Sequence, residues 1–201
     1  MVMKESEQEL ERGDPVPNFE LPGTDRETHT LADFADYEAL LLVFTCNHCP
    51  YAQAKFDLLN RIAEEYDDAA VVGINPNDDE EYPDDSFEKM VELVEDGTVR
   101  YDAYLRDETQ EAAEAYGATC TPDPFLLRNS EAQRASDSRA AEPRDGGDTF
   151  TLAYHGRLDD ALNPDDEPTE IYVDDAIDAV LAGEDVNLDF MPSRGCSIKW
   201  K

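Results

Sequence analysis

Two short apolar runs joined by one amphipathic segment constrain the fold most. Residues 39–44 are apolar throughout, and residues 70–75 form a second run of similar length and character. Runs this short are typical of strands that are buried on both faces of a parallel sheet. Residues 51–66, between them, carry apolar side chains at helical spacing. The sequence therefore predicts a β-α-β unit inside an α/β domain.

Weaker patterns extend this unit in both directions. A hairpin is expected over residues 16–34, further helices over residues 86–95, 108–116 and 171–181, and strands over residues 103–105, 125–127 and 149–155. The last two strands are separated only by residues 129–148, so they can pair as an antiparallel hairpin. These residues have no apolar pattern, which indicates an exposed insertion.

Three parts follow from this pattern. Residues 1–15 are expected to form a polar arm, either solvated or a short helix. Residues 16–183 are expected to form the α/β domain. Residues 184–201 are expected to be an irregular tail that packs on the domain.

The charge limits the partners and indicates an environment. The chain has 49 acidic and 16 basic residues, a net charge of −33. This charge repels nucleic acids and anionic membranes, so neither is an expected partner. The acidic residues are spread along the chain, as in cytoplasmic proteins of salt-accumulating halophilic archaea, where molar salt cuts the screening length to about 3 Å. Residues 1–17 lack the apolar core of a signal peptide, and no run reaches the roughly 18 residues of a membrane span. We expect a cytoplasmic protein.

A Cys-x-x-Cys motif follows the first apolar run directly. Cys46 and Cys49 lie where the strand ends and the helix begins. A helix N-terminus stabilises a thiolate, and two thiols at this spacing can close and reopen a disulfide. The motif therefore predicts thiol redox chemistry.

These cysteines have two other interpretations. Cys46, His48, Cys49 and Cys120 could converge on a metal ion, but structural zinc sites usually show a second Cys-x-x-Cys or a His pair. This sequence has neither, so we expect no metal and no cofactor. The other interpretation is a pair of inert core cysteines, which would not require this junction.

Three separated segments resemble one family. Thr45-Cys46-Asn47-His48-Cys49-Pro50-Tyr51 resembles the active-site segment of a peroxiredoxin-like, thioredoxin-fold family of the AhpC/TSA redoxin superfamily. Residues 116–127 resemble the Thr–cis-Pro loop that faces the cysteines in that fold, and residues 195–200 match the ending of the family. The resemblance implies a thioredoxin-like fold with a central mixed sheet flanked by helices. It also implies a cis Thr121-Pro122 bond, with the Thr121 backbone free to pair with a substrate strand.

The sequence departs from both patterns of this superfamily. Thioredoxins carry a buried acid six residues before the first cysteine, where this chain has Leu40. Peroxiredoxins carry a threonine and a proline before their peroxide-reacting cysteine. If that cysteine is Cys49, Cys46 and Leu42 replace them. The missing hydroxyl favours disulfide exchange over efficient peroxide reduction.

Pro50 is relevant to whether Cys46 or Cys49 is the nucleophile. Proline prefers the first position of a helix, which would make Cys49 the N-cap, as in peroxiredoxins. A helix that starts at Cys46 would instead expose Cys46, as in thioredoxins. We favour Cys46 as nucleophile and Cys49 as resolving thiol. His48, as a cation, would lower the pKa of the neighbouring thiols, or it simply faces solvent.

The remaining cysteines and histidines have weaker signals. Cys120 lies two residues before Pro122, so it could serve as a third thiol near the pair, or be a small buried residue. We expect Cys196 to be a free thiol outside the chemistry. His29 and His155 have no visible partner and are expected to be structural or on the surface.

The predicted function is a thiol–disulfide oxidoreductase that acts on a protein or low-molecular-weight disulfide or dithiol. Cys46 and Cys49 would be catalytic, with Thr45, His48, Pro50, Thr121 and Pro122 in support. One alternative is a thiol peroxidase that uses Cys49, with Cys46 resolving. Another is a non-catalytic thioredoxin-fold module that binds a metal or a partner.

Overall fold

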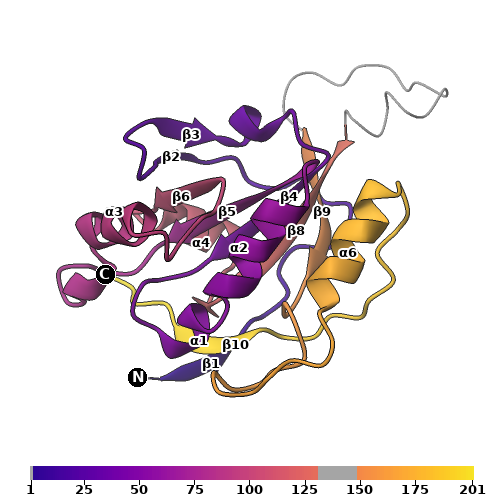
Figure 1. Ribbon diagram of the computed structural model, residues 1–201. Helices are drawn as coiled ribbons and strands as arrows, with labels where there is room; N and C mark the ends of the chain where they lie inside the picture. The colour runs from indigo at the N-terminus through magenta and orange to yellow at the C-terminus, as the bar shows by residue number, and fades with distance from the viewer. Residues whose placement is uncertain (1, 131–148) are drawn as a thin grey trace.

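A five-stranded mixed sheet forms the centre of the molecule (Figure 1). The computed structural model describes residues 2–130 and 149–201. The strand order is β6-β5-β4-β8-β9, with β4 at Ala39–Phe44, β5 at Ala69–Asn75, β6 at Ala103–Arg106, β8 at Asp123–Asn129 and β9 at Phe150–His155. β4 and β5 pair in parallel, whereas β4–β8 and β8–β9 are antiparallel. The predicted β-α-β unit and the predicted final hairpin are both confirmed.

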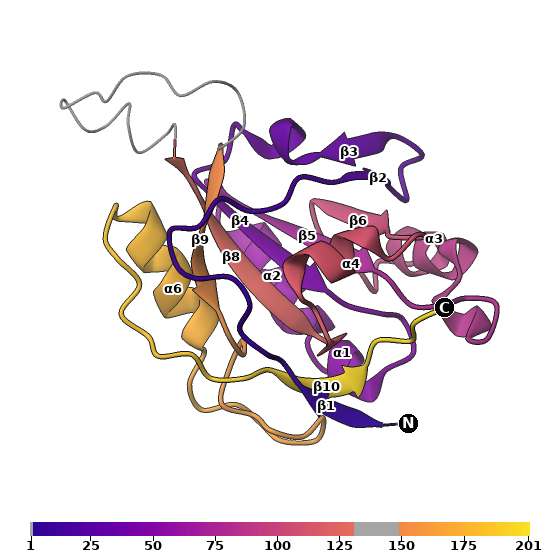
Figure 2. The same ribbon diagram turned by 180° about the vertical axis from the view of Figure 1, so that it is seen from behind.

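Helices cover both faces of this sheet (Figures 1 and 2). α2 (Phe56–Glu65) and α6 (Tyr172–Leu181) pack on the face that carries Leu41 and Val43. α4 (Glu111–Tyr116) packs on the face that carries Leu40 and Leu42. Both faces of β4 are therefore buried, which is the physical reason for its unbroken apolar run. The expected α/β, thioredoxin-like fold class is confirmed.

The smaller elements complete the domain. They are a hairpin of β2 (Glu20–Pro22) and β3 (Thr28–Thr30), the 3-10 helices η1 (Leu31–Phe34) and η2 (Pro83–Asp85), and the helices α1 (Pro50–Gln53) and α3 (Phe87–Glu95). The hairpin confirms the prediction for residues 16–34. The single helix expected over residues 51–66 is instead divided into α1 and α2. α4 begins at Glu111 rather than at residue 108, because Gln110 before it has a left-handed backbone (φ 67°).

The two ends of the chain form a second sheet that the sequence did not indicate. It has the order β1-β10-β7, with β1 at Met3–Glu5, β7 at Cys120–Thr121 and β10 at Arg194–Ser197. The expectations of an N-terminal solvated arm or helix and of a wholly irregular C-terminal tail were wrong. β1 pairs with β10, and β10 pairs on its other side with β7, so both ends of the chain gain backbone hydrogen-bond partners. β10 therefore lies against the segment that precedes Pro122.

Two further expectations concern the insertion and the membrane. Residues 131–148, nearly all of the expected insertion at 129–148, lie outside the described residues. In residues 2–130 and 149–201, no helix combines the length and the apolar character that a membrane span requires.

Candidate functional site

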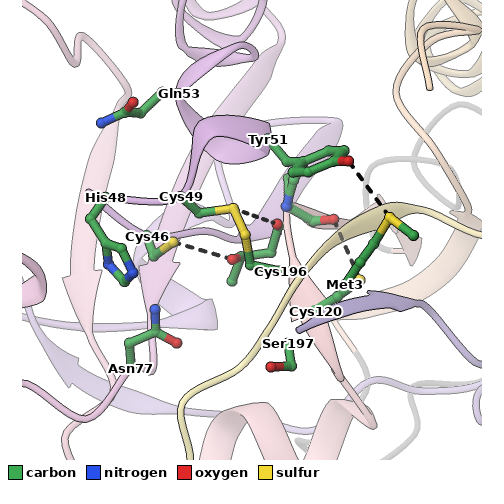
Figure 3. The surroundings of a disulfide bond; sticks show 12 residues. Met3, Cys46, His48, Cys49, Tyr51, Gln53, Asn77, Cys120, Cys196 and Ser197 are labelled. Atoms are coloured by element: carbon green, nitrogen blue, oxygen red, sulfur yellow. Dashed lines mark hydrogen bonds between the residues drawn. A yellow bond between two sulfur atoms is a disulfide. The ribbon is translucent and has the colours of Figure 1, made fainter. Parts of the chain in front are cut away.

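Cys49 and Cys196 are joined in a disulfide that links the loop before α1 to β10 (Figure 3). Their Cα atoms are 6.3 Å apart, although 147 positions separate the residues in the chain. Both residues are buried. The expectation that Cys196 is a free thiol was wrong, because β10 pairs with β7 in a register that aligns Cys196 with Thr121. That alignment brings the end of the chain to the active-site loop.

Thr121 contacts both sulfurs of the Cys-x-x-Cys motif. The Cys46 Sγ lies 3.2 Å from Thr121 Oγ1, and the Cys49 Sγ lies 3.6 Å from the Thr121 carbonyl oxygen (Figure 3). The peptide bond from Thr121 to Pro122 is cis, as the resemblance implies. Cys46, Cys49 and Cys196 thus belong to one buried cluster. Cys46 is a free thiol in this state, so a Cys46–Cys49 disulfide stays a prediction for another redox state.

The edge of Thr121 is already occupied by a strand. The resemblance implies a free backbone at this position, available to an extended substrate. Here β10 takes that place, with Cys196 aligned to Thr121 and Ser197 aligned to Cys120. The chain therefore presents its own cysteine-bearing strand to the loop.

The surroundings of Cys46 keep its thiol protonated. Burial raises the pKa of Cys46 to about 12, and the nearby Asp85 carboxylate acts in the same direction. The Thr121 hydroxyl and the Cys49 backbone amide act against this rise. α1 begins at Pro50, its first position, with Cys49 as the N-cap. The helix start that would have exposed Cys46 is therefore not observed, and Cys46 is fully buried.

A buried carboxylate organises the loop between the two cysteines. Asp85, on η2, accepts hydrogen bonds from the backbone amides of Asn47 (2.7 Å) and His48 (3.3 Å). It also accepts from His48 Nδ1 (2.6 Å) and from Asn77 Nδ2 (2.7 Å). The His48 ring stacks on Tyr82, with ring centroids 5.6 Å apart. His48 is thus held by specific contacts, and its side chain is only 16% exposed.

Sequence reasoning missed Asp85. The buried acid of the thioredoxin pattern is replaced by Leu40, but a carboxylate from a different segment reaches the same loop. Asp85 stands in an acidic stretch with Asp84, and such stretches are usually solvated surface. The proline before this pair, which begins η2, is the one local signal that the stretch is ordered.

Two other predicted site residues, Thr45 and Cys120, have contacts that are typical of structural residues. Thr45 is buried at the end of β4, and its hydroxyl has no hydrogen-bond partner in the described part of the chain. The Cys120 Sγ contacts the carbonyl oxygens of Pro122 and Ser193, each at 3.9 Å. Burial raises the pKa of Cys120. These contacts do not link Cys120 to the buried cluster that holds Cys46, Cys49 and Cys196.

Two histidines have partners that the sequence did not reveal. His155 Nε2 lies 2.9 Å from Asp123 Oδ1, and both side chains are buried. Burial raises the pKa of Asp123, and the bond to His155 opposes this. His29 pairs with Asp25 at 2.9 Å near the surface. Both histidines act as structural residues here.

One group of side chains could hold a metal ion. The ligand atoms of Cys46, His48 and Asp85 all lie within 4.8 Å of one another. The group is buried except for the edge of the His48 ring. It combines a thiol, an imidazole and a carboxylate, a donor set that suits zinc.

Comparison with known proteins agrees with the fold. The model of the AhpC/TSA family matches residues 12–136, so the chain belongs to the AhpC/TSA family of redoxins. A solved structure of an uncharacterized conserved protein from Geobacillus kaustophilus is 34% identical, with a TM-score of 0.83, over 100% of this chain and 97% of that one. A hypothetical protein from Sinorhizobium meliloti is also 34% identical, with a TM-score of 0.82, over 98% of both chains.

A more distant structure shares the fold alone. Peroxidoxin BcpB from Mycobacterium tuberculosis is 16% identical, with a TM-score of 0.53, over 86% of this chain and 95% of that one. A search of curated proteins found no match. Family membership and fold together make this protein a redox enzyme in the general sense.

Proposed function

We propose that this protein is a thiol–disulfide oxidoreductase in which Cys49 is the exchanging sulfur. The observation that carries the proposal is the Cys49–Cys196 disulfide beside the cis Thr121-Pro122 loop, with Cys46 as a third sulfur in the same cluster. A redoxin that holds three cysteines in contact can pass a disulfide among them and to a partner.

Two features favour Cys49 over Cys46 as the nucleophile. Cys49 immediately precedes α1, whose unpaired backbone amides favour a thiolate. Cys46 has its pKa raised to about 12 by burial and by Asp85, so it carries almost no thiolate at neutral pH. This reverses the roles that the sequence favoured.

The proposed exchange transfers two electrons from the protein thiols to the substrate disulfide. In the reduced protein, the Cys49 thiolate attacks a substrate disulfide, forms a bond to one substrate sulfur and displaces the other as a thiolate. The Cys196 thiolate then attacks the Cys49 sulfur, releases the second substrate sulfur and closes the Cys49–Cys196 disulfide. A protein or low-molecular-weight dithiol reverses both steps and is itself oxidised.

Cys46 has a place in this scheme as an internal thiol. Its attack on the Cys49 sulfur would form a Cys46–Cys49 disulfide and release Cys196 as a thiolate. The contacts that both sulfurs make with Thr121 support this step. β10 would then lose its covalent link, and an extended substrate could compete for the Thr121 edge.

A thiol peroxidase is the second candidate. The observation that favours it is Pro50 at the first position of α1 with Cys49 as the N-cap. In this version peroxide oxidises the Cys49 thiolate to a sulfenic acid and leaves as water or an alcohol. A second thiol then attacks the oxidised sulfur, expels water and forms the disulfide.

The environment is proposed from the charge. We propose a cytoplasmic protein that works in concentrated salt, since the net charge of −33 is spread over the whole chain. We also propose that residues 16–183 fold as one domain. Assays should therefore be run in molar KCl.

The test compares cysteine variants in two reactions, reduction of insulin disulfides and consumption of hydrogen peroxide. We expect Cys49→Ser to abolish insulin reduction and Cys196→Ser to accumulate a mixed disulfide on Cys49. Cys46→Ser should retain most activity, and Cys120→Ser is the matched control. Activity that survives in Cys49→Ser and vanishes in Cys46→Ser would overturn the assignment. Fast peroxide consumption with slow insulin reduction, both dependent on Cys49, would establish the peroxidase instead.

A further inference from the structure

The cluster of Cys46, His48 and Asp85 has the geometry of an incomplete zinc site. A tetrahedral zinc ion with bonds of about 2.0–2.3 Å holds its ligand atoms about 3.3–3.8 Å apart. The three ligand atoms here lie within 4.8 Å of one another. Closing the set changes these separations by at most about 1.5 Å, which small side-chain rotations can supply.

The charge around Asp85 also favours a cation. Its carboxylate is fully buried and accepts hydrogen bonds from uncharged groups of Asn47 and Asn77 and from the His48 ring. No salt bridge joins it to a lysine or arginine in residues 2–130 and 149–201, although the Lys199 ammonium acts electrostatically on the neighbouring Cys46 thiol. A buried carboxylate beside a buried thiol is costly without a cation. A divalent ion would neutralise both groups once the thiol loses its proton.

Cys49 is the candidate for a fourth ligand, and its sulfur is bonded elsewhere in this state. Cys49 lies on the same loop as Cys46 and His48, and its Sγ contacts the same Thr121 as the Cys46 Sγ. Its sulfur is bonded to Cys196. Reduction of that disulfide returns a thiol to the edge of the cluster.

We propose that the reduced protein binds one Zn²⁺ ion through Cys46, His48, Cys49 and Asp85, and that closure of the Cys49–Cys196 disulfide releases it. Binding displaces the protons of the two thiols into solvent. Release is driven by a low-molecular-weight disulfide such as glutathione disulfide. It takes two electrons from Cys49 and Cys196, forms the bond between them and becomes two thiols.

The ion has a route from solvent. His48 lines an open pocket of about 440 Å³ together with Asn47, Asp84 and Lys89. The His48 imidazole can thus capture the ion first and deliver it to the buried ligands. With zinc bound, both thiolates of the motif are occupied, so the ion would slow disulfide exchange at Cys49.

The test measures zinc affinity, which does not depend on exchange activity. The full chain is reduced with a phosphine under nitrogen in molar KCl and titrated with Zn²⁺ against a chromophoric chelator. We expect one equivalent of bound zinc, and thiolate-to-metal absorption when Co²⁺ replaces it. Oxidation to the Cys49–Cys196 disulfide should weaken binding at least about tenfold, the scale of a lost metal-site interaction.

Variants separate this site from weak binding to the acidic surface. Cys46→Ser and His48→Gln should each weaken binding at least about tenfold, whereas Cys120→Ser should bind as the wild type does. Asp85 also orders the loop, so the test relies on the other two ligand variants. Absence of stoichiometric zinc from the reduced wild type would overturn the proposal. Equal binding by the oxidised protein, or by Cys46→Ser and Cys120→Ser alike, would also overturn it.

Discussion

At the scale of single residues, Cys46 shows how surroundings set the reactivity of a thiol. It occupies the first position of the motif, yet it is fully buried and lies near the Asp85 carboxylate. Both effects favour the protonated form. The local motif alone could not reveal this, because Asp85 comes from a distant segment.

The pH dependence of Cys46 alkylation tests this environment. With the Cys49–Cys196 disulfide intact, the rate of iodoacetamide labelling should rise about tenfold per pH unit from about pH 7 to about pH 10, without a plateau. The reason is that the thiolate fraction keeps growing while the pH is below a pKa of about 12. Mass spectrometry of the labelled peptide measures the rate. A plateau near the ordinary thiol pKa would show that this description of the site is wrong.

Gly195 is the residue that permits β10 to approach β7. A Cβ added there would lie 2.0 Å from the Thr121 carbonyl oxygen. Gly195→Ala should therefore push the strands apart, lower the free energy of unfolding by about 1–3 kcal/mol and reduce the fraction of Cys49–Cys196 disulfide at a fixed glutathione ratio. Denaturant titration and thiol trapping measure the two effects. Ser197→Ala on the same strand is the control, and an equal effect there would contradict the assignment.

At the scale of elements, η2 acts as a support for the active-site loop. Its last residue, Asp85, satisfies two backbone amides of that loop and the side chains of His48 and Asn77. Asp85→Ala leaves these donors without a partner. We expect a loss of about 2–4 kcal/mol in the free energy of unfolding, measured by denaturant titration. Asp84→Ala is the matched control, and equal stability of the two variants would contradict this role.

Predictability from sequence differs between the five-stranded and the three-stranded sheet. β4 and β5 could be predicted because burial on both faces demands unbroken apolar runs. β1, β7 and β10 are two to four residues long, and strands this short leave no periodic pattern. Since β10 aligns Cys196 with the active-site loop, the disulfide partner of Cys49 was hidden together with the strand. The motif predicted thiol redox chemistry, but the pairing of β10 with β7 determines which sulfur lies close enough to bond to Cys49.

At the scale of the whole molecule, the charge predicts a dependence on salt. A net charge of −33 opposes compaction in dilute buffer. Concentrated salt shortens the screening length from about 10 Å at 0.1 M to about 3 Å at 1 M. The melting temperature should therefore rise steadily with KCl up to molar concentrations. A melting temperature that stays constant across this range, measured by circular dichroism, would contradict the proposed adaptation to salt.

The most direct test of the whole account is a map of the disulfides across a glutathione redox titration. The protein is equilibrated at each ratio in molar KCl, trapped by acid and alkylation, and analysed by mass spectrometry for the paired cysteines. We predict that Cys49–Cys196 is the main disulfide of the oxidised protein, with Cys46 and Cys120 alkylated as thiols after unfolding. A dominant Cys46–Cys49 disulfide with Cys196 free throughout would contradict the central role of the Cys49–Cys196 pair.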